Sequence, residues 1–233
     1  MMYGRVLRRS ALLAGALLLA VTGGMVSAKD SAPAGSWRTL FDGKLTDAFR
    51  GWRSEGFPQG WHVVDGTLAK EGDVDDLVTK EQFGNFELEL EWKIGNGGNS
   101  GVFYRATREY DHIYWSGPEY QLLDDANAGD GRNRLTAAAS AYALYGPPAG
   151  VVKPFGEWNK TRIVVDGDHV EHWLNGQKVV EYEFGSPGWK SKVAASKFAK
   201  YPNYGLAQKG YIGIQGDHSG ALALRRVRIR ELP

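Results

Sequence analysis

The sequence contains no cysteine among its 233 residues. A thiolate is therefore excluded as a nucleophile or a metal ligand, and no disulfide can stabilise the chain. A marked charge excess is also missing, because 28 basic residues stand against 27 acidic ones. Near-neutral charge without a basic run argues against nucleic acid or anionic membranes as partners. Stability must then come from an ordinary buried core, which a chain of this length can build.

The N-terminal segment lacks an apolar run long enough for a membrane span. Its apolar stretch, residues 11–21, is shorter than the roughly 20 residues that a spanning helix needs. Arg5, Arg8 and Arg9 precede this stretch, and the small-residue pattern Val26-Ser27-Ala28 follows it. This order of segments predicts a cleaved secretory signal peptide, residues 1–28, and an exported protein that works in the periplasm or outside the cell.

The remaining residues, 29–233, have a length typical of one all-β sandwich domain, and we expect a single domain. The predicted leader holds three arginines and no acid, so the mature part has 25 basic and 27 acidic residues. Glycine is frequent, with 31 residues, and there are 8 Trp and 11 Tyr. Glycine-rich turns between short aromatic segments favour a β-sandwich. Exposed Trp and Tyr rings could also stack on sugar rings, although most Trp residues are expected in the core.

Residues 86–94 give the strongest strand signal. Apolar residues at the even positions alternate with charged residues at the odd positions, which is the period of a strand with one buried face. The pairs Asp65-Gly66 and Asn175-Gly176 predict tight hairpin turns. Further strands are predicted at 61–64, 67–68, 100–106, 120–123, 141–145, 161–166, 169–174, 177–184, 210–215 and 221–231, and one helix at 190–200. Many short strands without β-α alternation indicate an all-β, antiparallel two-sheet sandwich.

Common catalytic motifs are missing. The sequence has no phosphate-binding Gly-x-x-x-x-Gly-Lys loop, no His-Glu-x-x-His metal motif and no Gly-x-Ser-x-Gly elbow. Glu87, Glu89 and Glu91 look like paired glycosidase carboxylates, but they lie opposite an apolar stripe, where nothing shelters them to raise a pKa. We interpret them as a solvated face.

Polar side chains also interrupt several aromatic, strand-like segments. Alternation places Arg105 on the face of its strand opposite Tyr104, and it places Glu119 and Gln121 together on one face. Similar candidates occur in three later segments: His172, then Gln215 with His218, then Arg225. Each has a simpler interpretation. The arginines could form surface ion pairs, His172 could be a hydrogen-bonded core residue, and Asp124 could serve a turn.

The chain resembles the 3-keto-disaccharide hydrolase family in segments that occur in order along the whole mature chain. The shared landmarks are residues 40–43, 51–52, 61–66, 99–105, 119–125, 144–145, 157–159, 171–176 and 213–218, the last reading Gly-Ile-Gln-Gly-Asp-His. The resemblance implies a jelly roll of the concanavalin A-like or laminin G-like type whose concave sheet holds a sugar. It also implies an exported bacterial enzyme that acts on glycosides already oxidised at C3 by a separate sugar dehydrogenase.

Such a substrate is cleaved most simply by elimination. A ketone at C3 acidifies the C2 hydrogen, so a base can remove it, and the substituent at C1 then leaves. Addition of water to the unsaturated sugar gives net hydrolysis without an oxocarbenium ion, so no fixed pair of carboxylates is needed. This chemistry asks for a base, a stabiliser of the C3 oxyanion and an acid for the leaving oxygen.

The resemblance suggests candidates for each role. Glu119 or His172 would act as the base, with His218 as a further catalytic residue. Arg105 or Arg225 would stabilise the enolate, or a divalent cation (Zn, Mn or Ca) held by Glu119, Asp124 and His218 would do so. The remaining substrate-binding candidates, which would hold sugar hydroxyls, are Gln121, Tyr145 and Gln215.

Two other functions stay open at this point. The same kind of sandwich hosts lectins, so the chain could be a non-catalytic carbohydrate-binding module. It could also be a structural domain of the cell envelope. Histidine and glutamate gathered in one hollow would favour catalysis, and their burial elsewhere would favour binding.

Overall fold

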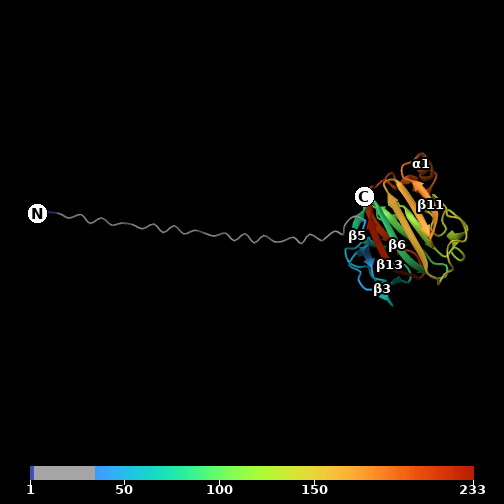
Figure 1. Cartoon of the computed structure of the whole chain (residues 1–233), viewed down its shortest axis with the longest axis horizontal. Coiled ribbons are helices and arrows are strands. Elements are labelled where there is room, and N and C mark those ends of the chain that lie inside the picture. The colour runs from blue at the N-terminus through green and yellow to red at the C-terminus, as the bar shows by residue number, and fades with distance from the viewer. Residues whose placement is uncertain (3–34) are drawn as a thin grey trace. The chain divides into compact units, whose positions relative to one another are not determined.

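Two antiparallel β-sheets pack face to face in the computed structural model, which describes residues 1–2 and 35–233 (Figure 1). The predicted signal peptide, residues 1–28, lies outside the described residues except for its first two. Within the described part of the chain, no helix is long and apolar enough to cross a membrane. The predicted all-β, two-sheet jelly-roll sandwich is confirmed.

The larger sheet has eight strands in the order β11-β10-β9-β6-β13-β4-β3, with β1 paired to β13. Its strands are β1 (Arg38–Phe41), β3 (Trp61–Val64), β4 (Thr67–Lys70), β6 (Phe86–Ile94), β9 (Asn159–Asp166), β10 (His169–Leu174), β11 (Gln177–Glu183) and β13 (Leu222–Glu231). The predicted hairpin turns occur at Asp65-Gly66 and Asn175-Gly176. All four of these residues have positive φ, as the primed turns favoured by such residue pairs require.

The smaller sheet has five strands in the order β2-β5-β12-β7-β8. They are β2 (Phe49–Gly51), β5 (Leu77–Phe83), β7 (Asn99–Ala106), β8 (Glu119–Leu123) and β12 (Gly210–Ile214). Its strands β7 and β8 pair so that Gly101 lies opposite Gln121 and Phe103 opposite Glu119. This register decides which side chains meet on the outer face of the sheet.

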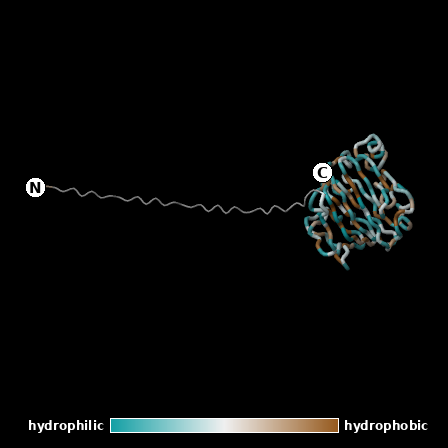
Figure 2. Tube along the Cα trace, in the orientation of Figure 1, coloured by the Kyte–Doolittle hydropathy of each residue, from teal (hydrophilic) through white to brown (hydrophobic). Residues whose placement is uncertain are grey.

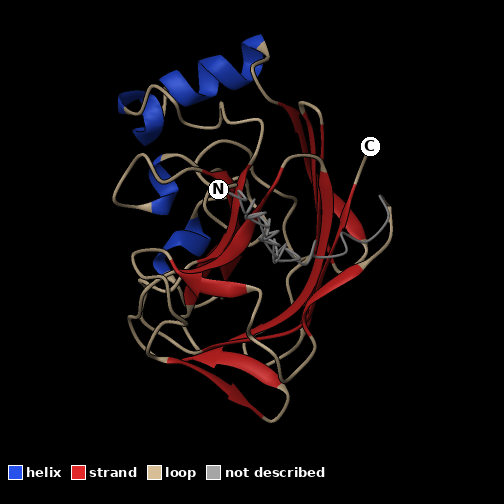
Figure 3. Ribbon diagram, turned by 90° about the vertical axis from the view of Figure 1, so that its left-hand side faces the viewer, coloured by secondary structure: helices blue, strands red, loops and turns tan. Residues whose placement is uncertain are grey.

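Helical segments gather on one side of the sandwich (Figure 3). They are η1 (Ile113–Trp115), η2 (Gly129–Arg132), α1 (Pro187–Ala194) and η3 (Lys197–Lys200), and η1 contacts β7 of the five-stranded sheet. The helix α1 begins after Ser186, whose hydroxyl accepts from the backbone N–H of Trp189, and Pro187 occupies its first turn.

The core lies between the sheets, and the strands alternate between hydrophobic and hydrophilic residues (Figure 2). On β6 the even positions from Phe86 to Ile94 are all buried. The predicted solvated face is only partly right. Glu89 and Glu91 are half-buried, and Glu87 is only 4% exposed because it pairs with Arg162 and Arg230. These carboxylates form a ladder of ion pairs on the eight-stranded sheet.

Three details differ from the predicted elements. Residues 141–145 form only isolated bridges, because Ala141 pairs both with Tyr120 and with Tyr145 in a tight loop. The predicted helix at 190–200 is divided into α1 and η3. The strands β1, β2 and β5 were not predicted, since the first two are short and β5 has three consecutive exposed residues in its middle.

Candidate active site

Glu119 begins β8, and its side chain lies across the backbone of the neighbouring strand at Gly101. A Cβ atom on Gly101 would stand 2.1 Å from Glu119 Oε1 and 2.7 Å from its Cγ and Cδ. Glycine at this position therefore makes the space in which the carboxyl group sits. The Gln121 amide is 2.9 Å from Glu119 Oε1 and 3.1 Å from Asn99 Oδ1, so it links the two side chains.

If the Glu119 carboxyl group is needed for activity, we expect Gly101→Ala to reduce kcat/KM by about tenfold or more, because the added methyl group displaces that carboxyl group. Gly56→Ala is the matched control, since a Cβ there meets nothing within 4 Å and the residue has no positive φ. Steady-state kinetics with thermal melts of both variants checks this. Equal activity of the two variants, both folded, would show that the position of the carboxyl group is unimportant.

Burial governs the ionisation of Glu119. The side chain is only 5% exposed, and burial raises its pKa to about 8, although the positive charges of Lys197 and His218 oppose the shift. At neutral pH the carboxyl group is mostly protonated. Once ionised, it is a far stronger base than an exposed glutamate, as proton transfer from carbon requires.

His218 lies in the loop that follows β12. Its Nδ1 is 3.0 Å from Asp217 Oδ1, and this hydrogen bond raises the pKa of the imidazole above its usual value despite partial burial. Burial alone would raise the pKa of Asp217, but His218 and other partners outweigh it and lower that pKa. Since Nδ1 is engaged by Asp217, Nε2 is the nitrogen that can face a substrate.

Two buried groups hold this loop in place. Lys70, only 1% exposed, donates through Nζ to the backbone oxygens of His218 (2.6 Å) and Gly72 (2.9 Å). Asp76 accepts from the N–H of Gly216 at 2.7 Å, and burial raises the pKa of Asp76 to about 7. A side chain at Gly216 would collide with the backbone oxygen of Asp75, 2.4 Å from its Cβ, so glycine allows this close approach.

Glu119 and His218 line a cavity of about 190 Å³ on the five-stranded sheet. Its lining residues are Asn99, Tyr114, Glu119, Gln121, Tyr142, Lys197, Gln215 and His218. Gln215 is 4% exposed and hydrogen-bonds to Asp217, yet its Oε1 has no hydrogen-bond partner. A buried acceptor without a partner is costly, so a ligand hydroxyl that reaches it would be favoured.

Lys197 brings a second positive charge to the cavity. It belongs to η3, and its Nζ lies 4.2 Å from the centre of the Tyr142 ring. The Tyr142 hydroxyl donates to Asp130 Oδ2 at 3.1 Å, which fixes the ring. The cavity therefore combines one buried carboxyl group with an imidazole, an ammonium group and three amides, a set suited to proton transfer at a polar ligand.

Comparison with known proteins identifies the family of the chain. Residues 36–230 match the family described as the 3-keto-alpha-glucoside-1,2-lyase-like domain. The chain belongs to this family. A 3-keto-disaccharide hydrolase of Bacteroides thetaiotaomicron is 36% identical in a match over 226 residues. The match covers 83% of this chain and 78% of that protein.

Solved structures extend the comparison. A Parabacteroides distasonis protein assigned as a glycosyl hydrolase superposes with a TM-score of 0.79 at 33% identity, covering 84% of this chain and 94% of the other. The catalytic domain of a laminarinase from Thermotoga petrophila, at 13% identity and a TM-score of 0.50, covers 84% of this chain and 98% of its own and shares the fold alone.

Not all predicted site residues reach the cavity of this 3-keto-alpha-glucoside-1,2-lyase-like domain. Glu119, Gln121, Gln215 and His218 line it together, but Arg105 does not. Strand β7 has a bulge opposite β12, where Tyr211 pairs with Ala106 and Gly213 with Phe103, and Arg105 takes a φ of 51°. The bulge shifts the alternation, so Arg105 is buried.

The side chain of Arg105 serves the structure. It donates to the backbone oxygens of Gly84 (3.1 Å) and Gly167 (2.8 Å), and its guanidinium lies over the ring of Phe184. The prediction that Arg105 stabilises an enolate in the hollow is therefore wrong.

His172 lies between the sheets and is fully buried. Its Nδ1 donates to the backbone oxygen of Ala139 at 3.0 Å, and its Nε2 accepts from the Tyr104 hydroxyl at 2.8 Å. Burial lowers the pKa of His172 to about 4, so the ring stays neutral. The simpler interpretation as a hydrogen-bonded core residue applies, because no substrate reaches this ring.

Three further candidates lie away from the cavity. Tyr145 stacks on Tyr182, with ring centres 4.9 Å apart. Arg225, on β13 of the eight-stranded sheet, pairs with Glu91. Asp124 accepts from the N–H groups of Gly97 and Ala126 and from the Asn127 amide, which is turn chemistry. The predicted cation site of Glu119, Asp124 and His218 is therefore not assembled.

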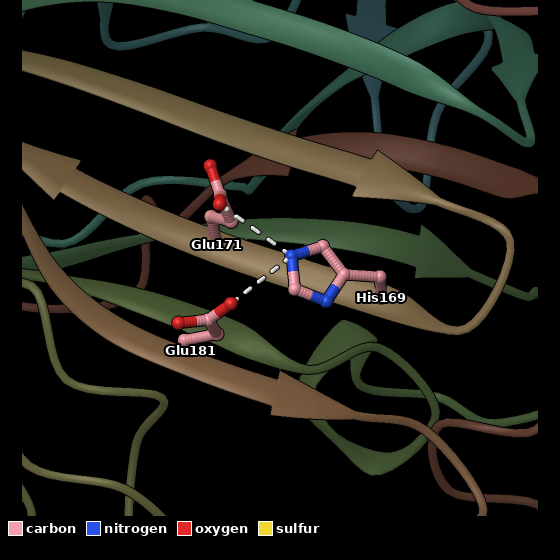
Figure 4. Close-up of side chains that lie close together, drawn as sticks. All are labelled: His169, Glu171 and Glu181. Carbon is pink, nitrogen blue, oxygen red and sulfur yellow. Dashed lines mark hydrogen bonds and ion pairs between the residues drawn. The ribbon is translucent and has the colours of Figure 1, made fainter.

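One other cluster has ligand-like spacing among the described residues: His169 and Glu171 on β10 and Glu181 on β11 (Figure 4). Lys178 Nζ is 3.1 Å from Glu171 Oε1 and 2.8 Å from Glu181 Oε2. The ammonium group thus already pairs with both carboxylates, and His169 Nε2 also lies within 3.5 Å of Glu171 Oε1 and 3.4 Å of Glu181 Oε1. We interpret the cluster as a network of ion pairs on the sheet surface.

Proposed function

We propose that this protein cleaves 3-keto glycosides by removing the C2 proton, eliminating the substituent at C1 and adding water to the product. The observation that carries this proposal is the composition of the cavity. Among the described residues that line it, Glu119 is the only acid. Ordinary glycosidases need two carboxylates across the scissile bond, whereas elimination next to a ketone needs a single base and positive charge at the C3 oxygen.

Glu119 takes the C2 proton in this mechanism. Its pKa of about 8 lies near neutral pH, so a useful fraction of the group is ionised and acts as a strong base. Lys197 stabilises the negative charge that forms on the C3 oxygen, in place of Arg105. As the C1–O bond breaks, protonated His218 gives its Nε2 proton to the leaving oxygen. The amides of Gln121, Gln215 and Asn99 orient the sugar hydroxyls.

Hydration follows with the roles reversed. Elimination leaves neutral His218, protonated Glu119 and a sugar with a C1–C2 double bond conjugated to the ketone. Neutral His218 then accepts a proton from water as the oxygen adds to C1, and Glu119 returns its proton to C2. Each residue ends in its initial protonation state, so the sum of the two steps is hydrolysis.

The biological setting is part of the proposal. The N-terminal pattern supports export to the periplasm or the exterior, and the substrate must come from an enzyme that oxidises the C3 hydroxyl of a glycoside to a ketone. The steps above are written without a cofactor, since the ketone of the substrate itself serves as the electron sink.

Incubation of the purified protein with a 3-keto glucoside and with the unoxidised glucoside tests the proposal. We expect release of 3-keto-glucose from the first substrate only. In D₂O deuterium should be incorporated at C2, because the protonated carboxyl group of Glu119 exchanges with solvent before it returns its proton. Cleavage of the unoxidised glucoside at a similar rate would refute the elimination mechanism. Tight binding of sugars without any cleavage would favour a carbohydrate-binding module.

A further inference from the structure

Five aromatic side chains form a continuous cluster next to the cavity: Tyr110, His112, Tyr114, Trp115 and Tyr201. Trp115 stacks on Tyr201, with ring centres 5.2 Å apart and planes at 20°. His112 stacks on Tyr114 at 5.0 Å and meets the Trp115 ring at 4.6 Å. All five residues are half-buried, so the cluster is partly open to solvent.

The cluster is continuous with the cavity wall. Tyr114 belongs to both, and Tyr201 directly follows η3, the segment that carries Lys197. His112 lies close enough to Asp217, the partner of His218, for the two to interact electrostatically, so this end of the cluster lies beside the loop that carries His218. By contrast, the half-buried Trp37 and Trp158 on the eight-stranded sheet are each covered by arginine side chains.

Cavity size indicates what the cluster is for. Pockets that enclose drug-sized ligands, the size class of a disaccharide, measure about 300–1,000 Å³. The cavity here measures about 190 Å³, which is too small for two sugar rings. If the keto ring fills it, the group attached at C1 must lie outside, against the neighbouring surface. Flat aromatic faces are the surfaces on which pyranose rings pack, through their C–H groups.

We propose that Trp115 and Tyr201, with their aromatic neighbours, form a binding site for a second pyranose ring, the leaving portion of a disaccharide substrate. This inference rests on the proposed function, since it takes the keto ring to lie against Glu119. It assigns the preference for a sugar leaving group to the η1 and η3 segments.

Kinetics of Trp115→Ala and Tyr201→Ala on two substrates tests the site. We expect kcat/KM for a 3-keto disaccharide to fall about tenfold, the effect of losing one good stacking surface, while that for methyl 3-keto-glucoside stays within about twofold. Trp37→Ala, on the other sheet, is the control and should change neither value. Equal losses on both substrates would overturn the proposal, as would no loss on the disaccharide.

A binding measurement separates this inference from the proposed function. Calorimetric titration with an unoxidised disaccharide, which has no ketone to react, should show weaker binding to Trp115→Ala and Tyr201→Ala than to wild type, by about fivefold or more. Two variants guard against the misfolding of one, which thermal melts would reveal. Unchanged binding in folded variants refutes the aromatic site. Absence of turnover by wild type refutes only the proposed function.

Discussion

Glu119→Gln should lower kcat/KM on a 3-keto glycoside by about 10²–10⁴-fold, the usual contribution of a general base. The amide keeps the size of the side chain above Gly101 but cannot accept the C2 proton. Steady-state kinetics on both proteins measures the loss. Deuterium exchange at C2, followed in D₂O, should slow by a similar factor, because it reports the first proton transfer alone.

The same substitution should make the protein more stable at alkaline pH. Burial raises the pKa of Glu119 from 4.5 to about 8, so between these values the native state holds a proton that the unfolded chain has released. The free energy of unfolding therefore falls as pH rises from 4.5 to 8. Glutamine removes this dependence. We expect the Tm of Glu119→Gln to exceed that of wild type by at least about 2–4 °C at pH 8, the shift that 1 kcal/mol gives in a domain of this size, and by little at pH 4.5.

Other buried groups do not obscure this comparison. Asp76, with a pKa raised by burial to about 7, also makes stability fall with rising pH. His172, with a pKa lowered by burial to about 4, makes stability rise between about pH 4 and its ordinary value of 6.5. The effect of His172 is shared by wild type and variant, so it cancels in the difference. The charge of Asp76 itself raises the pKa of Glu119, so the part of its effect that acts through Glu119 belongs to the difference that is measured.

Glu157→Gln is the matched control for both measurements, since Glu157 is exposed and lies outside the cavity lining. It should change neither kcat/KM nor the pH dependence of Tm. A folded Glu119→Gln protein with activity within tenfold of wild type would remove Glu119 as the base. An unchanged Tm difference between pH 4.5 and 8 would contradict the buried, protonated carboxyl group.

Local patterns predicted the fold well because strands and hairpin turns depend on neighbouring residues. The alternation of residues 86–94 and the Asp65-Gly66 turn needed no distant information, and both occur as predicted. The short strand β2 was missed, since three residues carry too little pattern. Residues 141–145 have an apolar strand-like composition, but their hydrogen bonds close a local loop.

The candidate site was predicted where simple alternation holds and missed where it does not. Glu119 and Gln121 share a face because β8 is regular. Arg105 was misplaced because a bulge depends on the pairing of β7 with β12, which the sequence of β7 alone does not contain. His172 occupies a core position of β10 between the buried Val170 and Leu174, so alternation alone favoured its burial.

Lys197 was missed for another reason. It lies in η3, far in the sequence from the strands of the site, and only the tertiary structure brings this segment to the cavity. A lysine in a lysine-rich helical stretch gives no local sign of function. Its position over Tyr142 and its effect on the pKa of Glu119 are what identify it.

Lys197→Met should therefore reduce kcat/KM by about ten- to a hundredfold. This is less than the roughly 10²–10³-fold loss expected for a preorganised oxyanion donor, because the side chain of Lys197 is exposed to solvent. Methionine keeps the length of the side chain but stabilises no charge on the C3 oxygen. The pKa of Glu119 should also rise, since a positive charge that lowers it is gone. The pH profile of kcat/KM should accordingly shift to higher pH, which a purely structural role of Lys197 would not produce.

Lys190→Met provides the comparison, because Lys190 is an exposed residue of the adjacent helix α1 and does not line the cavity. It should leave both the rate and the pH profile unchanged. If Lys197→Met loses activity without a shift in the profile, Lys197 acts on the substrate but not on Glu119. If neither the activity nor the pH profile changes, Lys197 neither stabilises the charge on the C3 oxygen nor acts on Glu119, and the role proposed for it is refuted.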